Sequence, residues 1–181
     1  GHEILETGIE SKYDVRSVIK RDATGAVYFD DTRLGVSDSK KPICAIAFDI
    51  GTTTVVGYLL DLETGETIST VSLLNPQSKF GADVVSRANY AIQNGGEVLA
   101  GTIRNALSEL VEEAVNEAGI AKEQIYLVTV VGNTCMHHLF LGISTKTLVL
   151  APYKPAVVEP QRLRAVDYGI DVNENAQLLV L

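Results

Sequence analysis

The chain has 181 residues, 46% of them hydrophobic, which is enough apolar material for one ordinary domain or for a domain with an appendage. Its 15 basic and 23 acidic residues give a formal net charge of −8, and no cluster of lysine or arginine interrupts this balance. Because of this acidic balance, we expect no nucleic acid and no membrane surface among its partners. In addition, no apolar run is long enough to span a bilayer.

The first part of the chain predicts a small β module that ends in a linker. The runs VRSVI at 15–19 and AVYFD at 26–30 are strand-like, and the turn composition DATG between them suits a hairpin. The polar segment SDSKKP at 37–42 follows. We take residues 1–42 as the end of a preceding β module with its linker, and residues 43–181 as the main body.

The main body predicts strands first and helices later. Apolar runs at 45–50, 54–62 and 67–74, separated by two turn signals, indicate an antiparallel meander. Three-and-four apolar spacing then predicts helices over 82–92 and 97–118, with Gly119 as a plausible stop for the second.

The last third of the chain predicts a return to strand. A β-branched run at 125–131 suits a central strand, and a helix over 134–141 starts directly from it. The three prolines of LAPYKPAVVEP, at 150–160, indicate a surface loop or edge segment, and 176–181 is one more apolar run.

The turn DIGTTT between the first two main strands is the strongest candidate site. Asp49 ends a strand that we expect to be buried, where a carboxylate needs a cation such as Mg²⁺, held through water. Gly51 lets the backbone approach a phosphate, and Thr52, Thr53 and Thr54 offer N–H and hydroxyl donors. The alternative is an ordinary hairpin whose aspartate caps its own turn.

A second candidate is the turn VVGNT at 130–134. A central strand runs into Gly132 and Asn133, and Thr134 is positioned to cap the following helix, whose N-terminus attracts anions. A simple strand-to-helix joint remains the alternative for this segment.

Other polar residues allow two interpretations. Asn75, Gln77, Asp83 and Arg87 either line a cleft or cap a helix and form a surface ion pair. The adjacent histidines at 137–138 form a poor metal chelate, because neighbouring residues point to different sides of a helix.

The two cysteines, Cys44 and Cys135, are far apart and each lies in an apolar segment. Such cysteines suit buried, inert thiols in a reducing cytoplasm, although the first turn of a helix would acidify Cys135. The chain contains neither GxxxxGK[ST] nor a GxGxxG after a strand, so neither a P-loop nor a Rossmann site is supported.

The order strand–DxGTT–strand–strand, helices, strand and helix resembles the first lobe of the superfamily of sugar kinases, actin and heat-shock chaperones. More narrowly, four segments resemble the reductive activators of corrinoid proteins, ferredoxin-like proteins with a C-terminal ATPase domain of the ASKHA type. These segments are AFDIGTTTVVGYLLDLETGE, LLNPQSKFGADVVSR, VVGNTCMHHLFLGI and LAPYKPAV.

This resemblance implies an α/β fold of the ribonuclease-H-like type, a mixed sheet flanked by helices, with the small β appendage in front. It places Asp49 and Thr52–Thr54 on the first phosphate loop of an ATP site, with Asp49 as the catalytic residue. The second phosphate loop and the adenosine site are expected downstream, in a second lobe that this chain lacks.

The resemblance also implies that the parent protein uses ATP to return a corrinoid protein from Co(II) to Co(I), through a [2Fe–2S] cluster. The cluster spacing C-x4-C-x2-C is absent, so the cluster is expected outside this chain. The expected partners are a nucleotide and a corrinoid protein, with a homodimer as an open option. The alternatives are a small-molecule kinase lobe, an activator of acyl-CoA dehydratases, or a non-catalytic, nucleotide-dependent interaction module.

Overall fold

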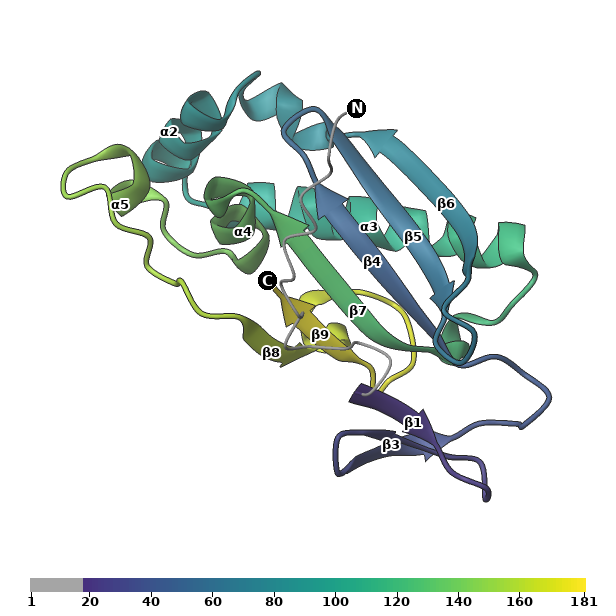
Figure 1. Cartoon of the computed structure of the whole chain (residues 1–181). Helices are drawn as coiled ribbons and strands as arrows, with labels where there is room; N and C mark the ends of the chain where they lie inside the picture. The colour runs from purple at the N-terminus through teal and green to yellow at the C-terminus, as the bar shows by residue number, and fades with distance from the viewer. Residues whose placement is uncertain (1–17) are drawn as a thin grey trace, which may run out of the picture.

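The structure is a computed structural model that describes residues 18–181 (Figure 1). It contains a three-stranded and a six-stranded sheet. Among the described residues, no helix combines the length and the apolar character that a membrane crossing needs.

The small sheet is antiparallel, with strands β1 (Ile19–Arg21), β2 (Ala26–Phe29) and β3 (Thr32–Val36) in that order. The predicted hairpin is confirmed for β1 and β2, although the beginning of its first run lies outside the described residues. The sequence did not predict β3, because only its middle residue is buried and the run shows little apolar character.

The large sheet has the order β6-β5-β4-β7-β9-β8. Strands β4 (Cys44–Ile50), β5 (Thr54–Asp61) and β6 (Thr67–Leu74) form the predicted antiparallel meander. Strand β7 (Ile125–Gly132) is parallel to β4 and is central, as predicted, because β9 (Gln177–Val180) pairs with its other edge, also in parallel. The antiparallel β8 (Gln161–Arg164) forms the outer edge.

Helix α3 (Glu97–Ala118) crosses one face of the large sheet (Figure 1). It ends as predicted, because Gly119 adopts a left-handed conformation with φ of 66°. Helices α2 (Val84–Asn94) and α4 (Thr134–Leu141) lie at one end of the sheet in Figure 1. The remaining helical turns are η1 (Pro76–Phe80), η2 (Lys122–Gln124), α5 (Lys146–Val149) and η3 (Ala165–Tyr168).

The two faces of the large sheet differ in what covers them. Alternate residues of β4, among them Ile46 and Phe48, belong to the main core together with the buried side of α3. On the opposite face, Ala45 and Leu127 belong to a second core that includes the small sheet. Arg162 of β8 adds a polar connection, since its guanidinium carbon lies 3.9 Å from the centre of the Phe29 ring.

We expect Leu107→Ala to reduce the free energy of unfolding by about 2–5 kcal/mol, because it leaves a cavity in the main core. Leu107 is completely buried on α3, whereas Val98 of the same helix is 54% exposed. Val98→Ala is the matched control, with an expected change within about 0.5 kcal/mol. Urea titration followed by circular dichroism measures both, and equal effects would contradict this assignment of the buried face.

Candidate functional site

The two turns predicted as binding segments lie at the same edge of the large sheet. Strands β4 and β7 are parallel, and Ile50 at the end of β4 is the register partner of Gly132 at the end of β7. A Cβ atom on Gly132 would lie 3.0 Å from the Ile50 carbonyl oxygen and 3.2 Å from the Cβ of Met136. Gly132 therefore permits the close approach of the two strand ends.

The β4–β5 turn is held tightly by backbone contacts. The N–H of Gly51 donates to the carbonyl of Thr54 at 2.9 Å, and the N–H of Asn75 donates to the carbonyl of Thr53 at 2.8 Å. A Cβ atom on Gly51 would lie 2.6 Å from the Thr54 carbonyl oxygen, closer than real Cβ atoms approach. Any other residue at position 51 would therefore displace the turn.

The turn presents polar groups to solvent. Asp49, Thr53 and Thr54 are exposed, and Gly51 and Thr52 are half-buried. Within residues 18–181, no hydrogen bond engages the backbone N–H of Thr52 or Thr53. Strand β4 is mostly buried, as expected, but Asp49 near its end is exposed, because its side chain belongs to the sheet face opposite α3, where no described element covers it. Its carboxylate is accessible to a hydrated cation.

The second turn is capped differently from the prediction. Asn133, not Thr134, is the N-cap of α4: its side-chain oxygen accepts from the N–H groups of Cys135 and Met136, each at 3.0 Å. The Thr134 side chain is exposed and remains available. Asn133 occupies the N-cap position because its backbone is extended, as an N-cap requires, whereas Thr134 already belongs to the helix.

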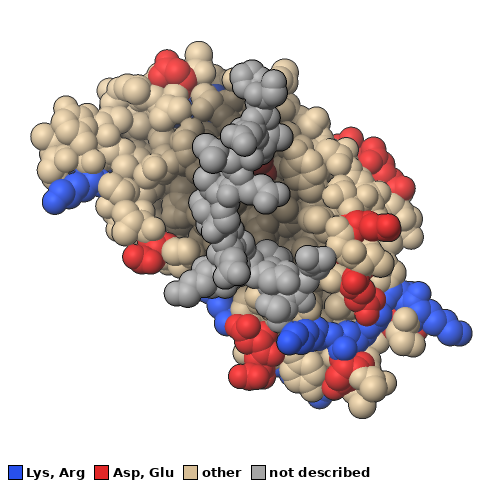
Figure 2. Space-filling model, in the orientation of Figure 1, with Lys and Arg blue, Asp and Glu red and all other residues tan. Residues whose placement is uncertain are grey.

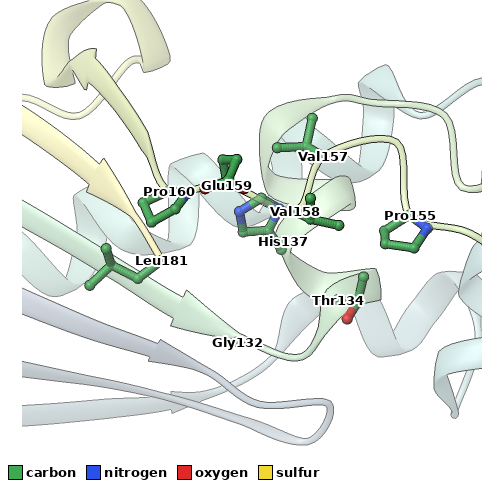
Figure 3. Close-up of a pocket in the computed structure, with 9 residues that line it drawn as sticks. All are labelled: Gly132, Thr134, His137, Pro155, Val157, Val158, Glu159, Pro160 and Leu181. Carbon is green, nitrogen blue, oxygen red and sulfur yellow. The ribbon is translucent and has the colours of Figure 1, made fainter.

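A pocket of about 250 Å³ lies beside this second turn (Figure 3). Thr134 and His137 enter it from α4, and the segment 155–160 forms the opposite wall (Figure 3). Burial and the neighbouring His138 lower the pKa of His137. The sequence gave no indication of this pocket, because its two walls are distant along the chain.

The neighbouring His138 has a structural role. It is completely buried, its Nδ1 lies 2.8 Å from the Thr134 carbonyl oxygen, and the N–H of Ala156 lies 3.0 Å from its Nε2. Nε2 must accept from Ala156, so the ring proton is assigned to Nδ1, which donates to Thr134. His138 thereby attaches the pocket wall to α4. No group of three metal-ligating side chains occurs within residues 18–181.

The polar residues between β6 and α2 have separate functions. Asp83 caps α2, since its carboxylate accepts from the N–H of Ser86 at 2.9 Å. Arg87 was expected on the surface in one interpretation, but it is completely buried, and its Nε donates to the Gly81 carbonyl at 2.8 Å. Gln77 is also buried and donates to the Leu99 carbonyl at 3.0 Å. Gln77 and Arg87 therefore hold neighbouring backbone segments inside the protein and do not line an open cleft.

Neither turn, 49–54 or 130–134, contains a lysine or an arginine. Figure 2 shows the lysine and arginine side chains of the visible face at its margins, mainly near the small sheet. Phosphate recognition here would therefore depend on backbone N–H groups and helix dipoles more than on a basic cluster.

Both cysteines are buried, as predicted. Burial raises the pKa of Cys44 to about 12, with further contributions from Asp61 and Glu63. Burial also raises the pKa of Cys135 to about 11, although Arg87 acts in the opposite direction. Desolvation thus outweighs the acidifying effect of Arg87 on Cys135.

At pH 8 we expect iodoacetamide to alkylate both cysteines at least about 100-fold more slowly in the folded chain than in urea, because so little thiolate is present. Because both pKa values are higher in the folded chain than in the unfolded chain, the protonated thiols favour the folded state below the ordinary cysteine pKa. This contribution to stability is lost as the pH rises toward 11–12. Mass spectrometry of quenched samples gives the rates. Rapid modification of Cys135 in the folded chain would contradict its assignment as an inert thiol.

Comparison with known proteins identifies close relatives of this arrangement. Residues 44–181 match the family described as the RACo middle region. The chain is 37% identical over 139 residues to the corrinoid activation enzyme RamQ of Eubacterium limosum, covering 76% of this chain and 23% of that protein.

A solved structure of a reductive activator for corrinoid, iron–sulfur protein superposes with a TM-score of 0.78 and 34% identity. The match covers 83% of this chain and 24% of that one, so the chain spans about a quarter of the length of these relatives. Because the family match covers most of the chain and includes both turns, the protein belongs to the family described as the RACo middle region.

Proposed function

We propose that this chain supplies one wall of an ATP site in a reductive activator that returns a corrinoid protein from Co(II) to Co(I). The observation that carries the proposal is the meeting of the DIGTTT and GNT turns at the carboxyl ends of parallel β4 and β7. Ligands of open α/β sheets bind outside the carboxyl ends of their strands. The relatives' described activities support the corrinoid protein as the partner.

The fold order supports a first lobe of the ribonuclease-H-like, ASKHA type. An antiparallel meander is followed by a helix and then by a strand parallel to the first. In this proposal the rest of the nucleotide site lies outside the chain, and the intact protein acts in the cytoplasm, with a homodimer as its proposed assembly.

Each site residue has a distinct proposed role. Asp49 holds the hydrated Mg²⁺ of the nucleotide, because its carboxylate is exposed at the strand end. The backbone N–H groups of Thr52 and Thr53, which have no partner within residues 18–181, donate to phosphate oxygens, and the exposed Thr53 hydroxyl donates to a further one. Gly132 keeps the second turn close to the first, and Asn133 orders the N-terminus of α4 beside it.

The cysteines do not fit an iron–sulfur cluster. Four thiolates are needed for a [2Fe–2S] centre of the ferredoxin type, and this chain has two buried cysteines, one in β4 and one in α4. The proposal therefore assigns the [2Fe–2S] cluster to another part of the longer protein.

We expect Thr53→Ala to weaken Mg-ATP binding by about tenfold, the effect of losing one hydroxyl hydrogen bond to a charged phosphate. Thr70→Ala removes a hydroxyl from an exposed position in β6, away from the turn, and is expected to leave the Kd unchanged. Isothermal titration calorimetry measures both. Equal affinity of the wild type and of Thr53→Ala, both measured in the full-length protein, would favour a turn that only docks a partner protein.

In the full-length protein we expect Asp49→Asn to reduce the ATP-dependent rate of Co(I) formation by about 10- to 100-fold, as for other groups that orient a metal through water. The corrinoid absorbance in the presence of a low-potential reductant reports the rate. Asp167→Asn, at an exposed position in η3, is the matched control. An ATP-dependent rate unaffected by Asp49→Asn would overturn the proposed role.

A further inference from the structure

We infer that Asn75 is the positioning residue of the phosphate loop, an assignment that rests on the proposed function. Asn75 is completely buried behind the loop and follows β6 directly, 24 residues after Gly51. Its side-chain Nδ2 donates to the Gly51 carbonyl at 2.8 Å, and its backbone N–H donates to the Thr53 carbonyl at 2.8 Å. One residue therefore holds two carbonyls of the turn.

These two contacts decide where the loop's N–H groups point. The peptide bonds of the loop are trans, and in a trans peptide the C=O and the following N–H point in opposite directions. Because the Gly51 carbonyl is turned inward to Asn75, the N–H of Thr52 is turned away from the protein interior. The contact to the Thr53 carbonyl orients the peptide between Thr53 and Thr54 in the same way, so the peptide that carries the N–H of Thr53 lies between two fixed peptides.

The Asn75 amide also replaces a hydrogen bond that a tight turn would make by itself. The N–H of Gly51 donates to the carbonyl of Thr54, but the reverse bond, from the N–H of Thr54 to the carbonyl of Gly51, is not formed. The Gly51 carbonyl accepts from Asn75 instead. The turn is thus held open by a residue from outside the hairpin.

Asparagine suits this position because the side chain here must donate one hydrogen bond and accept another. Its Oδ1 accepts from the N–H of Gln77 at 3.0 Å and caps η1, while its Nδ2 donates to Gly51. A buried amide with both ends paired is stable in one orientation only, which fixes the loop. Nδ2 also lies 3.9 Å from the Met136 sulfur in α4, so Asn75 is positioned between the two turns.

The decisive variant is Asn75→Ser, which keeps an N-cap acceptor for η1 but is too short to reach the Gly51 carbonyl. The matched control is Gln77→Met, which removes a buried hydrogen bond from the same helical turn, the one to the Leu99 carbonyl, without touching the loop. Calorimetry with Mg-ATP, thermal unfolding and amide hydrogen exchange of Gly51 are measured for both variants and for the wild type, each in the full-length protein.

We expect both variants to lower the melting temperature, but only Asn75→Ser to weaken Mg-ATP binding, by about tenfold or more. Exchange of the Gly51 amide is expected to accelerate by about tenfold in Asn75→Ser and to stay within about twofold in Gln77→Met. If Asn75→Ser does not fold, Asn75→Asp takes its place. Its introduced carboxyl donates to Gly51 only when protonated, so Gly51 protection should increase as the pH is lowered.

The outcomes separate this inference from the proposed function. A full-length wild-type protein that does not bind Mg-ATP overturns the proposed function, and Gly51 exchange then decides alone whether Asn75 fixes the loop. If Thr53→Ala weakens binding while Asn75→Ser changes neither affinity nor exchange, the inference is overturned and the proposed function stands. Equal loss of affinity in Gln77→Met and Asn75→Ser would reduce Asn75 to a general structural role.

Discussion

The parallel pairing of β4 with β7 is the constraint on which the candidate site depends. The pairing runs to the carboxyl ends of both strands, where Ile50 is opposite Gly132, and it brings two turns together that are about eighty residues apart in the chain. Strand β7 is hydrogen-bonded on both edges, to β4 and to β9, so its end has little freedom. The absence of a side chain on Gly132 is what permits this contact.

Within residues 18–181, helix α3 covers one face of the large sheet and the small sheet covers only part of the other, and this difference leaves Asp49 accessible. Helix α3 packs on the first face and makes the main core with it. The small sheet covers the second face only where Ala45 and Leu127 lie, far from the carboxyl end of β4. Asp49 therefore remains exposed although the strand that carries it is central and mostly buried.

Buried polar side chains that follow β6 in the chain hold neighbouring backbone segments together. Asn75, Gln77 and Arg87 are each completely buried, and each donates to a backbone carbonyl. Within residues 18–181, the Oε1 of Gln77 and the Nη2 of Arg87 have no hydrogen-bond partner. Burying such atoms costs free energy, so these three side chains stabilise the fold less than apolar side chains of the same volume would. Their directed hydrogen bonds, however, specify the geometry more closely.

Local patterns in the sequence were sufficient for most of the fold. Alternation and turn composition predicted the meander, and the three-and-four spacing with Gly119 predicted the 22 residues of α3. Such patterns are local, because strand and helix periodicities are read from neighbouring residues. The DIGTTT turn was recognised for the same reason, since its residues are contiguous. The weakly apolar β3 was missed because it carries no such pattern.

The sequence by itself thus determined the main elements and the chemistry of the first turn. Only the tertiary structure decided that Asp49 is exposed, that Arg87 is buried, and that Asn75 holds a loop 24 residues away. Each of these depends on which segments meet across the fold, and contacts between distant segments leave no periodic signal in the chain. The residue types of the candidate site can therefore be read from contiguous stretches of sequence, whereas its geometry depends on contacts between distant segments.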